Sequence, residues 1–261
     1  MDELASVNGT IGRAEEMTIP VTDEGLLRGD GVFEVARLYA GRPFAWDEHL
    51  ARLLRSAANV RLEFDLGAAR AEVDALLAKA GAVDGTIRLL ITRGGRRVAV
   101  LAPLPERGES VTLGTVEYAP TRVLDAVKSL SYAANMLASR LAREAGADEA
   151  LLVTPDGRVL EAPTSAFFYV RGGALHTPPL ADHILDSITR RHVLALTGAS
   201  ERGLARDELT GLDEAFLAST TREVQPVSAI DGRALPAVPG PVTAAAAEAL
   251  RRYIDERTAA S

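Results

Sequence analysis

Alternation of apolar and polar residues predicts strands in the first half of the chain. The clearest run is VFEVARLY at 32–39, which a turn at 40–43 connects to a partner strand at 44–46. Apolar residues at 50, 53, 54, 57 and 60 have helical spacing and predict a helix over 47–60, with Asp47 as its N-cap. A second helix, AARAEVDALLAKAG, ends at Gly81. Three further strands are predicted in TIRLLITRGG, VAVLAPLP and SVTLGTVEYA.

The second half alternates helices with short strands. Helical spacing appears in ANMLASRLAREAG, ILDSITRRHVLALTG and TAAAAEALRRYIDERTA. Strands interrupted by Pro-Asp-Gly and Gly-Gly turns are predicted in the stretch from EALLVT to ALHT, and again in EAFLASTTREVQPVSAIDGRAL. These patterns predict an α+β chain with a small N-terminal α/β domain at 1–117, a linker at 118–124 and a larger domain at 125–261.

Composition excludes several classes of function. The net charge of −7 argues against nucleic acid or an anionic membrane as the main partner. The chain has no cysteine, which excludes disulfides and thiolate chemistry and fits a reducing cytoplasm. Its four histidines have no metal-ligand spacing, so no metal site is expected. Neither a signal peptide nor an apolar run of about 18 residues is evident, so we expect a cytoplasmic protein.

Lysine is scarce in a chain that is rich in arginine. Only Lys79 and Lys128 occur among 29 basic residues. A lysine amine can lose its proton when desolvated and can form an imine with an aldehyde, which a guanidinium cannot do. The sequence VKSLSYA around Lys128 is mostly apolar or small, as in a buried pocket. The simpler interpretation is a lysine that extends from a strand edge into solvent, and the residues alone favour it.

Other polar residues resemble parts of a cofactor site. Glu161 follows a predicted strand, where it could cap a turn or face a protonated ring nitrogen. Hydroxyls in STT at 219–221 and the helix start DSITRR at 186–191 suit an anion, although such clusters are also ordinary turns and caps. Arg52 could bind a phosphate or could simply face solvent. Together, a lysine, a carboxylate, two anion-binding segments and an arginine match the needs of pyridoxal phosphate.

These motifs, in this order and spacing, resemble the class IV aminotransferases, the fold-type-IV enzymes that use pyridoxal 5′-phosphate. The resemblance extends from LLRGDGVFEVARLYAGRPFAWDEHLARLLRSA to FLASTTREVQPVSAIDG. It implies the fold of D-amino acid aminotransferases, with two α/β sub-domains and the cofactor between them, and a homodimer. It also implies an amino donor and a 2-oxo acid as substrates.

The resemblance assigns roles to individual residues. Lys128 matches the lysine that forms the imine and then moves the substrate proton, and Glu161 matches the carboxylate at the ring nitrogen. Leu185 matches the residue that packs on the ring. The phosphate would be held by Arg52, Ile188, Thr189 and Thr220.

One segment departs from the family pattern. The family usually has a small residue two positions after the glutamate and an asparagine three positions further on, where this chain has Pro163 and Ala166. Because the glutamate itself is retained, the cofactor interpretation holds, but the substrate geometry on that side is expected to differ.

The substrate class is less closely specified by the sequence. VFEV favours the D-amino acid group over branched-chain enzymes, and Val35 lacks the hydroxyl that helps elimination in aminodeoxychorismate lyases. The leading hypothesis is a transaminase for D-amino acids and some R-primary amines. The alternatives are the lyase, a branched-chain L-amino acid aminotransferase, and a cofactor-binding protein without turnover. Substrate contacts are expected from Phe33, Val35 and Thr221, and Tyr132 follows the lysine as an aromatic residue does in many relatives. The substrate carboxylate would be bound by arginines drawn from Arg28, Arg88, Arg96 and Arg97, with Arg28 and Arg88 favoured.

Overall fold

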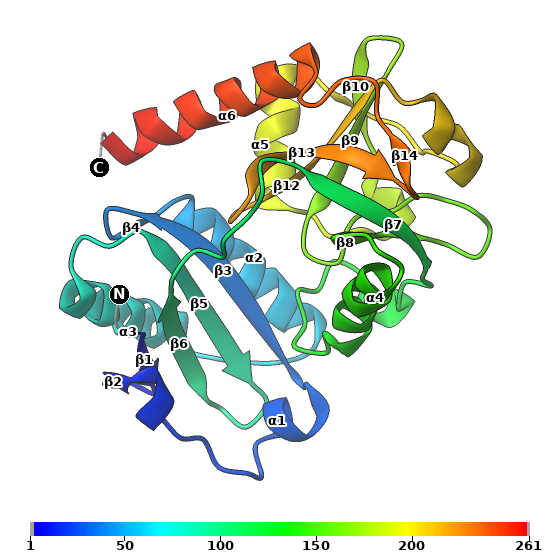
Figure 1. Ribbon diagram of the computed structural model, residues 1–261. Coiled ribbons are helices and arrows are strands. Elements are labelled where there is room, and N and C mark those ends of the chain that lie inside the picture. Colours follow the sequence, from blue (N-terminus) through cyan, green and yellow to red (C-terminus); the bar gives the residue numbers. More distant parts are fainter. Residues whose placement is uncertain (1–2, 260–261) are drawn as a thin grey trace. The chain divides into compact units, whose positions relative to one another are not determined.

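The computed structural model describes residues 3–259 of the chain. Within them, contacts between Cα atoms define two compact units. Unit 1 comprises the residues up to Pro105, the segment Ala126–Tyr132 and the C-terminal residues from Arg257, and unit 2 comprises Glu106–Asp125 and Ala133–Glu256. Each unit is built on one β-sheet with its own helices (Figure 1).

Unit 1 contains a six-stranded antiparallel sheet with the order β2-β1-β6-β5-β3-β4. Two long helices, α2 (Trp46–Asn59) and α3 (Leu66–Ala80), pack on one face of this sheet (Figure 1). A short helix, α1 (Glu24–Arg28), precedes β3. The strands are β1 (Leu4–Val7), β2 (Thr10–Arg13), β3 (Gly31–Tyr39), β4 (Arg42–Pro43), β5 (Gly85–Thr92) and β6 (Arg97–Ala102).

The start of α2 differs from the prediction. The predicted strand at 44–46 is wrong, because the partner strand is β4 and Trp46 already belongs to the helix. Asp47 is not the N-cap either. Ala45 takes that position with a left-handed φ of 54°, while Asp47 lies in the first turn, where its charge favours the helix dipole. The predicted strand at 32–39 and the helix end at Gly81 are confirmed.

The two faces of the unit 1 sheet have different compositions. Side chains of Val32, Ala36 and Leu38 on β3 point into the core beneath α2 and α3. Alternation along the strand therefore places Phe33 and Val35 on the opposite face. Val35 lies directly across from Arg88 on β5. The sheet thus separates a hydrophobic core from a face that carries three of the predicted substrate-binding residues.

Unit 2 contains an eight-stranded sheet, with seven strands in the order β11-β10-β9-β12-β13-β7-β8 and β14 beside β13. Its helices are α4 (Ala133–Glu144), α5 (Ile188–Thr197) and α6 (Pro241–Ala259), the last of which continues into unit 1. The strands are β7 (Val111–Glu117), β8 (Glu149–Val153), β9 (Ala166–Arg171), β10 (Ala174–Thr177), β11 (Ser200–Glu201), β12 (Glu214–Ser219), β13 (Glu223–Ile230) and β14 (Arg233–Ala234).

The contacts divide the chain differently from the predicted boundary near 117. Strand β7 pairs in parallel with β8 and β13, so its backbone hydrogen bonds tie it to the sheet of unit 2. The segment Ala126–Tyr132 belongs to unit 1 instead. The stretch 118–124, which contains a turn of 3-10 helix at Arg122–Leu124, stays a predicted linker.

The predicted helix that begins at Ile184 begins four residues later, at Ile188. Ser187 is its N-cap, and the Ser187 hydroxyl accepts a hydrogen bond from the backbone N–H of Arg190 at 3.3 Å. Its end at Gly198, in a left-handed conformation, agrees with the prediction.

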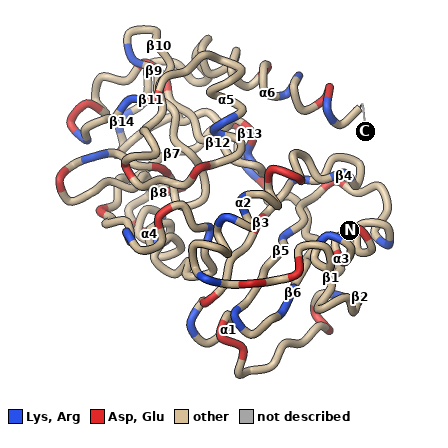
Figure 2. The backbone as a smooth tube through the Cα atoms, turned by 180° about the vertical axis from the view of Figure 1, so that it is seen from behind, with Lys and Arg blue, Asp and Glu red and all other residues tan. Residues whose placement is uncertain are grey.

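Acidic and basic residues are interspersed along the chain in both units (Figure 2). No helix between residues 3 and 259 is long and apolar enough to cross a membrane.

Candidate active site

Lys128 lies on a short segment that runs beside the first residues of β3. Its carbonyl accepts a hydrogen bond from the Phe33 N–H at 3.0 Å, and its own N–H donates to the Ser56 hydroxyl on α2 at 3.1 Å. Gly31 permits this approach, because a Cβ there would lie 2.6 Å from a methyl carbon of Leu130. The backbone of the lysine is therefore fixed from both the strand and the helix.

The Lys128 side chain is half-buried among aromatic rings. Its Nζ lies 4.4 Å from the ring centroid of Phe33 and 5.7 Å from that of Tyr132. These two rings meet edge to face, with centroids 5.3 Å apart. The guanidinium carbon of Arg88 lies 5.5 Å from the Phe33 ring centroid. The structure thus brings together a lysine, an arginine and two aromatic side chains, all of which the sequence singled out.

The four candidate arginines differ in what they bind. Arg28 is exposed and forms an ion pair with Glu24 one helical turn earlier. Arg97 donates from both Nε and Nη2 to Glu72 on α3, at 2.9 and 2.7 Å. Arg96 donates to the Gly94 carbonyl at 2.6 Å. The Arg88 guanidinium, in contrast, makes no hydrogen bond or ion pair with any residue of the described range 3–259.

Arg52 is buried, with 5% of its surface exposed, so the solvent-facing alternative is wrong. Its guanidinium forms a two-point ion pair with Glu34 on β3, and Glu34 also contacts His49. Sequence reasoning missed Glu34 and His49. The available signal was the alternation of side chains along β3. Glu34 lies on the same strand face as Val32 and Ala36, so its charge is buried and needs a partner.

In unit 2, Glu161 lies next to a tight turn. Its Oε1 accepts a hydrogen bond from the backbone N–H of Leu185 at 2.9 Å. Burial raises the pKa of Tyr118, and the Glu161 carboxylate raises it further, so this phenol lies near the carboxylate. Sequence reasoning did not predict that neighbour, which arrives from the segment after β7.

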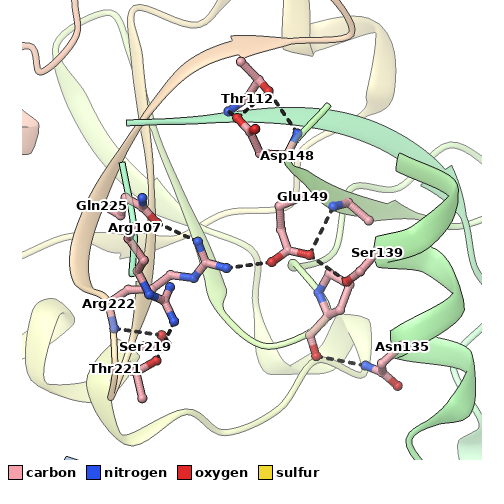
Figure 3. Close-up of polar contacts among 12 residues, drawn as sticks. Arg107, Thr112, Asn135, Ser139, Asp148, Glu149, Ser219, Thr221, Arg222 and Gln225 are labelled. Atoms are coloured by element: carbon pink, nitrogen blue, oxygen red, sulfur yellow. Dashed lines mark hydrogen bonds and ion pairs between the residues drawn. The ribbon is translucent and has the colours of Figure 1, made fainter. Parts of the chain in front are cut away.

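The turn after Glu161 is held by an amide from another element. Ala162 and Ser165 form an isolated bridge across the turn, and Asn135 on α4 donates to the Pro163 carbonyl at 3.0 Å (Figure 3). Ala166, at the position of the family's asparagine, is buried as the first residue of β9. An asparagine amide thus does contact this turn, but it comes from a different part of the sequence.

Two further segments of unit 2 carry the predicted anion-binding groups. Ile188 and Thr189 are buried in the first turn of α5, where backbone N–H groups lack helical acceptors. Thr220 and Thr221 lie in the turn that joins β12 to β13. Arg107 donates to the Thr221 hydroxyl at 2.8 Å (Figure 3).

A buried ion pair, also missed by sequence reasoning, anchors this turn. Arg222 donates from Nη2 to Glu149 on β8 at 2.6 Å and from Nη1 to Gln225 at 2.6 Å (Figure 3). Ser139 on α4 donates its hydroxyl to Glu149 at 2.7 Å. The hydroxyl-rich turn is therefore connected to β8 and α4 through these side chains. The sequence does not reveal the contact, because the residues that form it are far apart along the chain.

Each unit, taken by itself, carries a different set of polar groups. Unit 1 provides an amine beside aromatic rings and a buried guanidinium, and unit 2 provides a carboxylate, helix N–H groups and hydroxyls. Residues 3–259 contain no cluster of metal-ligating side chains. An aldehyde, a ring nitrogen and a phosphate are the chemical partners that suit these groups.

The family model described as "Amino-transferase class IV" matches residues 31–230. The chain belongs to the class IV aminotransferases. It is 34% identical to the D-alanine aminotransferase of Bacillus licheniformis, over 97% of both chains. It is 35% identical to a putative branched-chain-amino-acid aminotransferase of Methanocaldococcus jannaschii, over 88% of both.

The fold agrees with this membership. A hypothetical aminotransferase from Mycobacterium tuberculosis, solved in a PLP-bound form, superposes with a TM-score of 0.88 at 27% identity, over 98% of this chain and 100% of that one. The predicted fold type IV architecture is thus confirmed, with a sheet and helices in each unit. Class IV aminotransferases depend on pyridoxal phosphate, and this chain carries residues of the types that the cofactor needs.

Proposed function

We propose that this aminotransferase moves an amino group between a D-amino acid and a 2-oxo acid such as 2-oxoglutarate or pyruvate. The observation that carries the proposal is Arg88, a cation without a counter-ion in the described chain, next to the Phe33 ring that Lys128 also contacts. A guanidinium in this state suits the α-carboxylate of an amino acid. The similarity to a D-alanine aminotransferase supports the D configuration.

In this proposal, each residue of the candidate site has a separate role in amino transfer. Bound pyridoxal phosphate supplies an aldehyde for amine exchange and an electron-withdrawing ring. The Lys128 Nζ accepts the α-proton of the substrate and later returns a proton, so it acts as both base and acid. Glu161, oriented by the Leu185 N–H, would keep a proton on the ring nitrogen, and Leu185 would pack on the ring. The phosphate would be held by Arg52, by the helix start at Ile188 and Thr189, and by Thr220.

Arg88 then binds the substrate carboxylate. Phe33, Val35, Tyr132 and Thr221 contact the rest of the substrate. Arg28 and Arg97 are left out of this proposal, because each already pairs with a carboxylate. Since Val35 carries no hydroxyl beside Arg88, the residues favour transfer over elimination.

A branched-chain L-amino acid aminotransferase is the second candidate, because the putative branched-chain-amino-acid aminotransferase of Methanocaldococcus jannaschii is 35% identical over 88% of both chains. Steady-state assays with 2-oxoglutarate separate the two. We expect pyruvate from D-alanine and no comparable turnover of L-leucine. A preference for L-leucine over D-alanine would overturn the D-amino acid proposal.

Substituting Arg88 tests the carboxylate contact separately from general damage. Because hydrogen bonds to charged groups contribute about 1.5 to 3 kcal/mol, Arg88→Leu should lower kcat/KM for D-alanine about 10- to 100-fold. An R-primary amine without a carboxylate serves as the internal control and should lose much less. An equal loss for both donors would show that Arg88 does not read the carboxylate.

The class IV resemblance also predicts a homodimer. Light scattering at micromolar concentration should give twice the chain mass of 27.6 kDa.

A further inference from the structure

A cluster of three ionisable side chains lies in the core of unit 1. Glu34 is 0% exposed, His49 is 1% exposed and Arg52 is 5% exposed. Glu34 points from β3 toward α2, where His49 and Arg52 are three residues apart and therefore on the same helix face. Burying charged groups so completely is costly unless they satisfy one another.

Both carboxylate oxygens of Glu34 accept hydrogen bonds within the cluster. Glu34 Oε1 accepts from Arg52 Nε at 2.6 Å, and Oε2 accepts from Arg52 Nη2 at 2.7 Å and from His49 Nδ1 at 2.8 Å. Burial alone would raise the pKa of Glu34, but the hydrogen bonds from Arg52 and His49 outweigh it and lower the pKa to about 2. Glu34 is therefore a carboxylate at every working pH.

His49 is held in its neutral form. Burial lowers its pKa, against the opposing effect of the Glu34 carboxylate, and the positive charges of Arg52 and Lys128 lower it further. Because the ionised carboxylate has no proton to donate, the proton of the neutral ring sits on Nδ1 and is donated to Glu34. The cluster thus contains one negative charge, one positive charge and one neutral donor.

This geometry fixes the direction of the Arg52 guanidinium. A planar fork that donates from Nε and Nη2 to the two oxygens of one carboxylate has a single orientation. His49 fixes the carboxylate in turn, since its ring binds one of the same oxygens. The plane of Arg52 is consequently set by the protein itself and does not depend on a bound anion for its order.

We propose that Glu34 and His49 are positioning residues that preorganise Arg52 for the phosphate of the cofactor. The inference rests on the proposed function, in which Arg52 binds that phosphate. Neither residue touches the cofactor in this account. Their contribution is to remove the entropy cost of orienting a long side chain when the phosphate binds.

Binding of two related ligands separates this role from a merely structural one. Pyridoxal lacks the phosphate of pyridoxal phosphate but keeps the aldehyde and the ring. If Glu34 orients Arg52, its loss weakens the phosphate-dependent part of binding, so the ratio of the two affinities changes. If the cluster only stabilises the fold, the loss lowers the melting temperature and leaves that ratio unchanged.

The experiment measures dissociation constants of both ligands for the intact protein and for Glu34→Gln, which keeps the shape but removes the charge and one acceptor. We expect the preference for pyridoxal phosphate over pyridoxal to fall about tenfold or more, since a two-point charged contact is lost. Glu72→Gln is the matched control, because Glu72 forms a part-buried pair with Arg97 in the same unit, and it should keep the wild-type ratio.

An unchanged ratio in folded Glu34→Gln would overturn the inference while leaving the proposed function intact. A wild-type chain that shows no preference for the phosphorylated ligand would instead refute the phosphate site of the proposed function, including the role of Arg52. If Glu34→Gln does not fold, His49→Gln decides the matter. Its ratio should fall by a smaller factor, and an unchanged ratio there would also count against the inference.

Discussion

Replacing Glu149 by leucine leaves the Arg222 guanidinium buried without its carboxylate. The side chains of Arg222 and Glu149 are only 10% and 7% exposed, and their Nη2–Oε2 distance is 2.6 Å. Burial lowers the pKa of Arg222, and Glu149 opposes that shift, so the carboxylate stabilises the charge where it lies. Removing one partner of a buried pair costs about 3 to 5 kcal/mol. For a chain of this size, that corresponds to a fall in melting temperature of roughly 6 to 20 °C.

Thermal unfolding of four proteins tests this reasoning. Glu149→Leu should show the full loss, whereas Glu149→Leu with Arg222→Met should recover most of it, because two apolar side chains leave no buried charge. Glu248→Gln is the control, since Glu248 and Arg252 form an exposed pair on α6 whose contribution should be at most about 1 kcal/mol. If Glu149→Leu melted no lower than Glu248→Gln, or if the double variant were the least stable, the buried pair would not anchor the turn at 219–222.

Two further predictions concern Lys128 and the decrease in the free energy of unfolding at acid pH. Lys128→Ala should abolish the imine absorbance of bound cofactor, and borohydride should no longer attach the cofactor to the protein; attachment that persisted would assign the imine to another amine. Glu34 has a pKa of about 2 against an ordinary 4.5, and burial lowers the pKa of His49 from 6.5, so both groups bind fewer protons in the folded chain than in the unfolded one. Stability should therefore be full above pH 6.5, fall as unfolded His49 gains a proton, and fall further between pH 4.5 and about 2. Because the shift from 4.5 to about 2 corresponds to about 3 kcal/mol, urea unfolding of Glu34→Gln should show a shallower acid limb than wild type, and parallel curves would contradict the assignment.

Local patterns predicted most elements because each depends on nearby residues. The alternation in β3, the leucine spacing in α2 and the glycine after α3 all act within one element. The start of α2 was misassigned because Ala45, a residue with no capping side chain, adopts a left-handed conformation there. The late start of α5 follows from the Ser187 cap, which outcompetes the apolar spacing of the preceding residues.

The candidate site shows where such reasoning stops. Lys128, Glu161 and Arg52 are visible in the sequence because their types are unusual for their surroundings or match a motif. Contacts between distant parts of the chain are not visible. Glu149 and Arg222, which pair with each other, lie 73 residues apart, and Tyr118 approaches Glu161 only through the path of the backbone after β7. Glu34 is the exception, because its position among inward-facing apolar residues would have indicated a buried charge.

The most direct test of the central claim is a half-reaction with one substrate. Purified protein with bound pyridoxal phosphate is mixed with D-alanine, and separately with L-alanine, while the visible band of the cofactor and the pyruvate formed are followed. We predict that D-alanine bleaches the band and releases one pyruvate per site, and that L-alanine at the same concentration does not. Bleaching by L-alanine alone, or no change with any D-amino acid, would contradict the account.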